Sequence, residues 1–192
     1  MFKKSWLYII LAIISILFAY FKNTPDKPLN TKPAKHTVNN VKTVNTGSGI
    51  TGKVTKVTDG DTVVILPEGG GKSFTCRLYG IDTPEVSKKG KAGQPYSEEA
   101  DKELESLILG QDVKVTLTGD KTYKREVCFI EKNGVDINLE MVRRGYAWAY
   151  RQYLDRPHSS DYINAEEAAR SRRSGLWQQA NPTPPWEFRH TK

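Results

Sequence analysis

The sequence predicts a small β-barrel of five strands with three α-helices packed on one side. Short β-rich runs broken by tight turns begin at Ile50, and a second group of such runs follows in the middle of the chain. Three further segments have apolar residues at helical spacing and end at a glycine. Five short strands, with one helix inserted after the third and two after the fifth, fit a small barrel covered by helices.

Three strands are expected between Ile50 and Ile81, where β-branched and aromatic residues dominate. The Asp59-Gly60 pair and the glycine-rich stretch 68–71 divide this segment, and both are typical of hairpin turns. A further pair of strands is expected at 113–118 and 127–130. Together these runs account for the five strands.

The three helices are predicted from caps and spacing. Ser97 is expected to be the N-cap of a helix that ends before Gly110. A second helix is expected over 136–144 with Gly145 after it, and a third over 160–173, closed by Gly175.

Charge is distributed unevenly along the chain of 192 residues. The 29 Lys and Arg exceed the 22 Asp and Glu by seven, but residues 1–49 hold seven Lys and one acid, so the rest is nearly neutral. This excludes a uniformly basic nucleic-acid coat protein, and any cationic site must rest on a few placed Arg and Lys. The two Cys and three His lack the close spacing of a structural zinc site.

The N-terminus predicts a membrane-directed leader, followed by a linker. Residues 5–21 are 17 uncharged, mostly apolar residues after Lys3 and Lys4, a length that suits either a short membrane anchor or a signal peptide. The sequence after this run lacks the small-x-small pattern of a cleavage site, which favours an uncleaved anchor over residues 1–21. We therefore expect residues 5–21 to engage the membrane and the domain to be exported. It would be held on the outer side of the cytoplasmic membrane (periplasmic or cell surface), or secreted if the leader is cleaved.

Residues 22–49 are rich in Lys, Asn, Thr and Pro and are expected to be a disordered polar linker before the domain at 50–192.

Acidic residues next to strand ends indicate where the chemistry lies. Asp61 and Asp82 stand among β-branched residues, where carboxylates are costly unless they are paired, solvated or bound to metal. If their strands are neighbours, both carboxylates can face one oxygen-ligand site of the kind Ca²⁺ prefers, with the Thr83 carbonyl nearby. Glu85 follows Pro84 on a rigid turn and could hold or deprotonate a water molecule.

Arg77 requires a bend in the chain to reach this site. It lies five residues before Asp82, and an odd offset places two side chains on opposite faces of an ideal strand. A bend at Gly80 would bring Arg77 and Asp82 to the same pocket.

The chain resembles the thermonuclease, or staphylococcal nuclease-like, family in two motifs. These are Asp59-Gly60-Asp61-Thr62 and the Arg-x4-Asp-Thr-Pro-Glu segment from Arg77 to Glu85, and the likeness runs from about residue 50 to 188. The resemblance implies a five-stranded Greek-key barrel of the oligonucleotide-binding (OB) fold. It also implies Ca²⁺-dependent hydrolysis of phosphodiester bonds in DNA and RNA with little sequence specificity, leaving 3′-phosphates. A monomer without an obligate protein partner would suffice for this activity.

The resemblance also assigns roles to individual residues. It implies that Asp61, Asp82 and Thr83 are calcium ligands and that Asp59 is a neighbouring acid. It implies that Glu85 is the general base or orients the attacking water, and that Arg77 and Arg125 bind the reacting phosphate. The family usually has Gly where this chain has Lys124, and a Gly in a turn often supplies a positive φ that Lys resists. The direction in which Arg125 points is therefore open.

Several residues have two interpretations. Tyr150 and Tyr153 could stack on bases, whereas Tyr146 and Trp148 are expected in the core. Lys89, in the basic loop after Glu85, and Lys124 could contact the substrate, but a solvated loop explains Lys89 equally simply.

Two further alternatives concern the chain as a whole. In the family fold Cys76 and Cys128 lie on neighbouring strands, which allows a disulfide or two buried thiols. The domain could also be a non-catalytic barrel that binds nucleic acid or a protein, although such modules typically lose the acids or arginines retained here.

Overall fold

The computed structural model describes residues 49–191. The predicted anchor at 1–21 and nearly all of the predicted linker at 22–49 lie outside the described residues. No helix within 49–191 is both long enough and apolar enough to span a bilayer.

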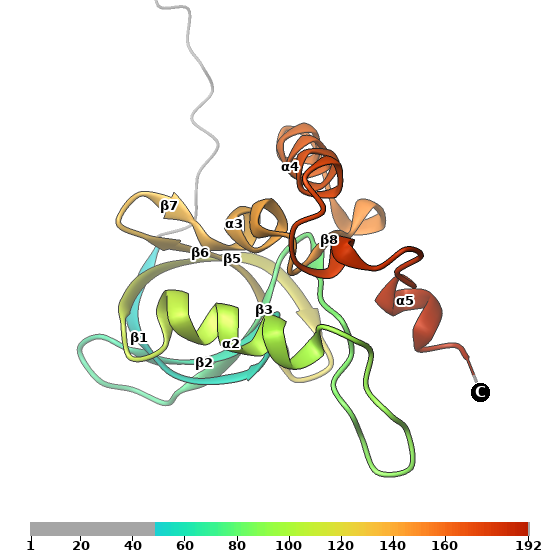
Figure 1. The fold of residues 1–192 in the computed structure, drawn as a ribbon. Helices are drawn as coiled ribbons and strands as arrows, with labels where there is room; N and C mark the ends of the chain where they lie inside the picture. Colours follow the sequence, from blue (N-terminus) through green and yellow to red (C-terminus); the bar gives the residue numbers. More distant parts are fainter. Residues whose placement is uncertain (1–48, 192) are drawn as a thin grey trace, which may run out of the picture. The chain divides into compact units, whose positions relative to one another are not determined.

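Five long strands form the barrel (Figure 1). They are β1 (Ile50–Asp59), β2 (Thr62–Pro67), β3 (Phe74–Leu78), β5 (Asp112–Thr122) and β6 (Arg125–Lys132). Their order is β3-β2-β1-β5-β6, and a parallel pairing of β3 with β6 closes the barrel. The predicted five-stranded barrel is therefore confirmed. Short two-residue strands complete the set: β4 (Ile81–Asp82) with β8 (Trp148–Ala149), and β7 (Val135–Asp136) at the edge of β6.

The barrel interior is a continuous apolar core crossed by one disulfide. Val54, Val63 and Ile65 are fully buried inside the barrel. A disulfide joins Cys76 of β3 to Cys128 of β6, with a Cα–Cα distance of 6.0 Å and both residues fully buried. It links the two strands whose pairing closes the barrel.

Two helices contact the barrel, and a third packs on one of them. Helix α2 (Ser97–Ile108) lies against β1, α3 (Ile137–Arg144) lies against β6 and α2, and α4 (Ser159–Ser171) packs on α3. Their bounds fall within two residues of those predicted, and Gly145 ends α3 with a φ of 83°, as its position suggested. The predicted N-cap of α2 was wrong: Ser97 is its first helical residue, and Tyr96 precedes it in the left-handed conformation (φ 69°). No side chain caps this helix, so the preference of Ser for N-caps does not act there.

A bend at Tyr79-Gly80 separates β3 from β4 and sets the position of the site. Gly80 has a φ of 71°, and a Cβ at this residue would lie 2.5 Å from Cδ2 of Leu154. The fully buried Asn138 of α3 donates hydrogen bonds from Nδ2 to the carbonyls of Tyr79 and Cys128. The strand that was expected to continue to Ile81 is therefore interrupted at Gly80, because glycine tolerates a left-handed backbone conformation.

The C-terminal part wraps a second apolar cluster. It contains the short helical turns η1 (Arg151–Tyr153), η2 (Gly175–Gln178) and α5 (Pro185–Phe188). Trp148 and Trp177 are buried against each other, and the guanidinium of Arg170 lies over both rings, at 4.6 and 3.9 Å from their centroids. Trp186 of α5 packs on this cluster from outside. The prediction that Trp148 belongs to the core is confirmed.

Candidate active site

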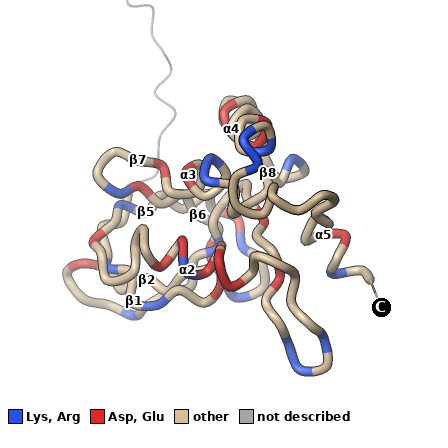
Figure 2. The backbone as a smooth tube through the Cα atoms, in the orientation of Figure 1, with Lys and Arg blue, Asp and Glu red and all other residues tan. Residues whose placement is uncertain are grey.

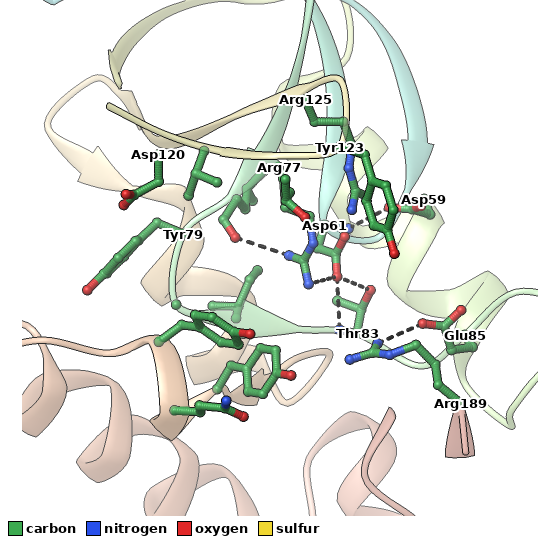
Figure 3. A pocket seen from close by; sticks show the side chains of 18 of the residues that line it. Asp59, Asp61, Arg77, Tyr79, Thr83, Glu85, Asp120, Tyr123, Arg125 and Arg189 are labelled. Atoms are coloured by element: carbon green, nitrogen blue, oxygen red, sulfur yellow. Dashed lines mark hydrogen bonds and ion pairs between the residues drawn. The ribbon is translucent and has the colours of Figure 1, made fainter. Parts of the chain in front are cut away.

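A cleft of about 900 Å³ lies between the barrel, the loop after β4 and the C-terminal segment (Figure 3). Its walls carry both signs of charge and several tyrosines, and they include most of the residues selected from the sequence. Members of that set are Asp59, Asp61, Arg77, Thr83, Glu85, Arg125, Tyr150 and Tyr153. Acidic and basic residues are interspersed over the domain (Figure 2), so the cleft is distinguished by the placement of its charges rather than by net charge.

Arg77 links the two buried aspartates. Its Nη2 lies 2.9 Å from Oδ2 of Asp61 and 2.9 Å from Oδ1 of Asp82, and its Nη1 donates to the carbonyl of Leu78. Asp61 and Asp82 are 6% and 1% exposed, so both carboxylates depend on these contacts in place of water. The bend at Gly80 therefore brings Arg77 and Asp82 together, as the spacing required.

Thr62 and Thr83 complete the environment of Asp61. The backbone N–H and the hydroxyl of Thr83 each donate to Asp61 Oδ2 at 3.2 Å, and the Thr62 hydroxyl donates to Oδ1 at 3.0 Å. Arg125 in turn donates from Nη1 to the Thr62 hydroxyl at 3.2 Å. A chain of hydrogen bonds thus connects the second arginine to the first aspartate.

The hairpin that carries Arg125 adapts to Lys124 without strain at that residue. The turn joins Thr122 to Arg125, which are paired across β5 and β6. Tyr123 takes the positive φ, at 57°, whereas Lys124 is not among the residues with positive φ. The substitution of Lys for the family's Gly therefore leaves Arg125 in the cleft.

Glu85 lies on the loop after Pro84, with both carboxylate oxygens occupied. Its Oε1 accepts from Arg189 Nη1 at 2.8 Å and its Oε2 accepts from Lys88 Nζ at 3.0 Å. Burial opposes ionisation of Glu85, but the hydrogen bonds and charges of Arg189 and Lys88 outweigh it, so its pKa is lowered. Glu85 is an anion at neutral pH and can accept a proton.

Two aspartates in the site resist ionisation. Burial, together with the charge of Asp61, raises the pKa of Asp59 to about 7. Burial also raises the pKa of Asp82 to about 6, although the hydrogen bond from Arg189 and the charge of Arg77 act in the opposite direction. The arginines therefore do not fully balance the carboxylates gathered here.

The donor set suits a hard divalent cation. Asp61 and Asp82 are converging carboxylates, and Ca²⁺ binds oxygen ligands of this type together with backbone carbonyls and water. Burial is the main cause of the raised pKa of Asp59 and of Asp82, and the charge of Asp61 adds to both shifts; a divalent ion would offset that charge. Within residues 49–191, however, no group of three or more His, Cys, Asp and Glu side chains is gathered as a metal site. Two carboxylates, a carbonyl and water would therefore have to suffice.

The four residues proposed for substrate contacts divide into two pairs. Tyr150 and Tyr153 line the cleft, with their rings 4.7 Å apart in an edge-to-face arrangement, and Tyr153 is 54% exposed. Lys89 and Lys124 are exposed and lie outside the lining, where the neighbouring Lys88 and Lys121 take their place. The sequence located both basic segments, and in each of them a different lysine from the one selected lines the cleft.

Arg189 is the site residue that sequence reasoning missed. It follows α5, more than a hundred residues after Glu85, and its guanidinium donates a hydrogen bond to Glu85 (Figure 3). The same guanidinium donates to both carboxylate oxygens of Asp82. The aromatic, proline-rich stretch Pro184–Phe188 indicates an ordered segment, with Pro at the first helical position. Nothing in the local spacing relates that segment to the carboxylates.

Comparison with known proteins gives a consistent set of relatives. The family model described as staphylococcal nuclease homologue matches residues 75–179. An uncharacterized endonuclease of Haemophilus influenzae is 37% identical over 137 residues, covering 71% of each chain. One of Escherichia coli O157:H7 is 37% identical over 144 residues, covering 74% of this chain and 87% of its own. A micrococcal nuclease of Shigella flexneri is 32% identical over 147 residues, covering 72% of this chain and 79% of its own. With the barrel and the motif residues around one cleft, these matches show that the chain belongs to the staphylococcal nuclease homologue family.

Proposed function

We propose that this protein is a Ca²⁺-dependent nuclease that hydrolyses phosphodiester bonds of DNA and RNA with little sequence specificity and leaves 3′-phosphate ends. The observation that carries the proposal is the convergence of Asp61, Arg77, Glu85 and Arg125 on the wall of one cleft, with the buried Asp82 paired to Arg77 behind that wall. The names of the relatives, which include a micrococcal nuclease and several endonucleases, support the same class of reaction.

Arg77 and Arg125 are suited to bind the reacting phosphate. Hydrolysis builds negative charge on the non-bridging oxygens, and guanidinium groups donate paired hydrogen bonds to such oxygens. Arg77 contacts Asp61, and Arg125 donates to the Thr62 hydroxyl, which itself donates to Asp61. Both guanidinium groups are therefore held in position before substrate binds. Positioning in advance lowers the reorganisation that the transition state requires.

Glu85 is the group placed to activate water. As an anion beside the cleft it can take a proton from a water molecule whose oxygen then attacks phosphorus. A 3′-phosphate product requires the bond from phosphorus to the 5′ oxygen to break. When bound by Asp61, Asp82 and the Thr83 carbonyl, Ca²⁺ would supply positive charge to the phosphate oxygens.

Weak sequence preference follows from the kinds of contact available. Tyr150 and Tyr153 offer aromatic rings, and stacking on a ring accepts any base. The arginines would contact phosphate, which carries no sequence information.

The decisive experiment measures cleavage of denatured DNA and of RNA with Ca²⁺ and with excess chelator. We expect cleavage with Ca²⁺, loss of cleavage in chelator and 3′-phosphate ends on the products. Full activity in chelator would refute the metal role. Binding without cleavage under all conditions would instead favour a non-catalytic barrel.

We further propose that the domain is exported and tethered by residues 5–21. The apolar run after Lys3 and Lys4 supports this, and so does the Cys76–Cys128 disulfide, because disulfides persist in oxidising compartments. Cell fractionation should find the full-length chain with the membrane. A shortened soluble form would mean that the leader is cleaved.

A further inference from the structure

The last described residues form a strap over the edge of the active site. We use the name C-terminal strap for residues 183–191, which include α5 and lie beyond the range matched by the family model. In Figure 1 the strap follows the helices at the end of the chain and contains α5, and Lys91 of the long loop after β4 donates hydrogen bonds to it. Its Arg189 side chain is 37% exposed and lines the cleft.

Arg189 contacts the metal-ligand candidate and the base candidate simultaneously. Nη1 donates to Asp82 Oδ1 at 3.1 Å and to Glu85 Oε1 at 2.8 Å, and Nη2 donates to Asp82 Oδ2 at 2.9 Å. One planar group, more than a hundred residues further along the chain, thus fixes the separation and orientation of the Asp82 and Glu85 carboxylates. Lys could not reproduce this geometry, because its ammonium is a single point charge.

The strap is anchored at three further points. The ring of Trp186 stacks on Tyr150, with centroids 5.0 Å apart and planes at 6°. Lys91 donates from Nζ to the carbonyls of Phe188 and Thr191, at 2.8 and 3.0 Å. Several independent anchors are typical of a permanent part of a site rather than of a segment that must leave before substrate enters.

Gln94 connects the strap to the backbone of Glu85. Its Oε1 accepts from the Glu85 N–H at 2.9 Å, while its Nε2 donates to the Thr183 carbonyl at 2.8 Å. The strap therefore holds Glu85 twice, through Arg189 at its carboxylate and through Gln94 at its main chain. Such contacts reduce the rotamers and loop positions open to Glu85.

We propose that Arg189, delivered by the C-terminal strap, is a positioning residue that holds Glu85 and Asp82 in place for hydrolysis. The proposal rests on the proposed nuclease function and adds to it a residue from the end of the chain. Partners that orient the residues of a metal site usually contribute 10- to 100-fold to activity or affinity.

The test compares Arg189→Gln and Arg189→Lys with the wild type in the full chain. His190→Gln is the matched control, because His190 is the exposed neighbour in the same strap and its side chain makes no hydrogen bond within residues 49–191. We expect Arg189→Gln to lower kcat by about 10- to 100-fold while KM changes less than about threefold, Arg189→Lys to recover part of the loss, and His190→Gln to match the wild type.

A double-mutant cycle with Glu85→Gln separates positioning from a general structural effect. If Arg189 acts through Glu85, its replacement should cost less than about threefold in the Glu85→Gln background. A loss that multiplies in full with that of Glu85→Gln would show that Arg189 does not act through Glu85 and would overturn that part of the proposal. So would a kcat unchanged in Arg189→Gln, or one raised by it, since a rise would mean that the strap obstructs the site.

A measurement without substrate or metal keeps the two proposals distinguishable. Hydrogen exchange of peptides covering residues 84–94 should be faster in Arg189→Gln than in the wild type and in His190→Gln. If the wild type cleaves nothing, the nuclease proposal fails, and the exchange rates alone decide whether Arg189 holds the Glu85 loop. Equal exchange rates in all three chains would show that it does not.

Discussion

The disulfide between Cys76 and Cys128 should contribute about 4 kcal/mol to the stability of the domain. The two cysteines are separated by 52 residues. The loop-closure relation for a cross-link of that span gives about 4 kcal/mol at 25 °C, because the bond restricts the unfolded chain. Whole domains are stable by about 5–15 kcal/mol, so this one bond accounts for a large share of the total.

Reduction isolates this contribution better than substitution. Both cysteines are fully buried between β3 and β6, so the reduced thiols stay in the same packed core. Replacing them by Ala would also remove buried sulfur atoms and leave a cavity. The difference between the oxidised and the reduced wild-type chain therefore reports mainly on the entropy of the unfolded state.

The assay is equilibrium unfolding in urea of residues 47–192, oxidised and fully reduced, at the same pH. We expect a loss of about 4 kcal/mol on reduction and a fall in Tm of roughly 12 °C, taking about 3 °C per kcal/mol for a domain of this size. The double variant Cys76→Ala/Cys128→Ala should be insensitive to reductant. Coincident unfolding curves for the two wild-type forms would refute the reasoning, as would two free thiols in the unfolded, unreduced chain.

Three further perturbations test the site and its support. Glu85→Gln should lower kcat by roughly 10²- to 10⁴-fold with nucleic-acid binding nearly intact, and unchanged turnover in a steady-state assay would remove Glu85 from the mechanism. The pKa of Asp59 is raised from 3.8 to about 7, so its contribution to stability is present below pH 4 and lost as the pH rises through 7. Asp59→Asn should flatten that dependence and raise the free energy of unfolding at pH 8 by at most about 4 kcal/mol; parallel pH profiles in urea unfolding would contradict this. Gly80→Ala combines a φ of 71° with a clash against Leu154, so it should cost about 2–4 kcal/mol, whereas Gly70→Ala at the open hairpin tip should cost less. Equal unfolding midpoints for the two glycine variants would contradict the conclusion that the bend requires a glycine at residue 80.

The barrel could be predicted because its signals are local. β2 is a run of β-branched and apolar residues, Cys76 and Leu78 of β3 are buried on either side of Arg77, and the turns at Asp59-Gly60 and 68–71 fall where those residues favour reversal. The β5–β6 hairpin extends beyond its predicted ends, to Thr122 and Arg125, because its outer part is polar and carries no apolar alternation. Backbone pairing between β5 and β6 stabilises this outer part of the hairpin, and the side-chain pattern of a sequence does not predict such pairing.

The acidic centre could be predicted only as far as the chain keeps its members close together. Asp61 lies in the turn between β1 and β2, Asp82 lies on β4 shortly after β3, and the single bend at Gly80 was enough to relate Arg77 to Asp82. Arg189 comes from a segment whose position depends on Trp186 and Lys91, that is, on tertiary contacts across about a hundred residues. Such a contact has no period and no fixed spacing, so no reading of a single sequence could have supplied it.

The balance of charge explains why a third arginine belongs in this site. Asp59, Asp61 and Glu85 line one cleft with the buried Asp82 beside it, and burial favours the neutral form of Asp59 and Asp82. The proposed reaction needs the opposite, a Glu85 ionised enough to accept a proton and an Asp82 able to hold a cation. Arg189 acts in that direction on both, since its hydrogen bonds favour the ionised form of each carboxylate. A phosphate that displaced Arg77 from the aspartates would leave Arg189 as the guanidinium still holding Asp82, so the strap can keep the acidic centre in order while the other arginines bind substrate.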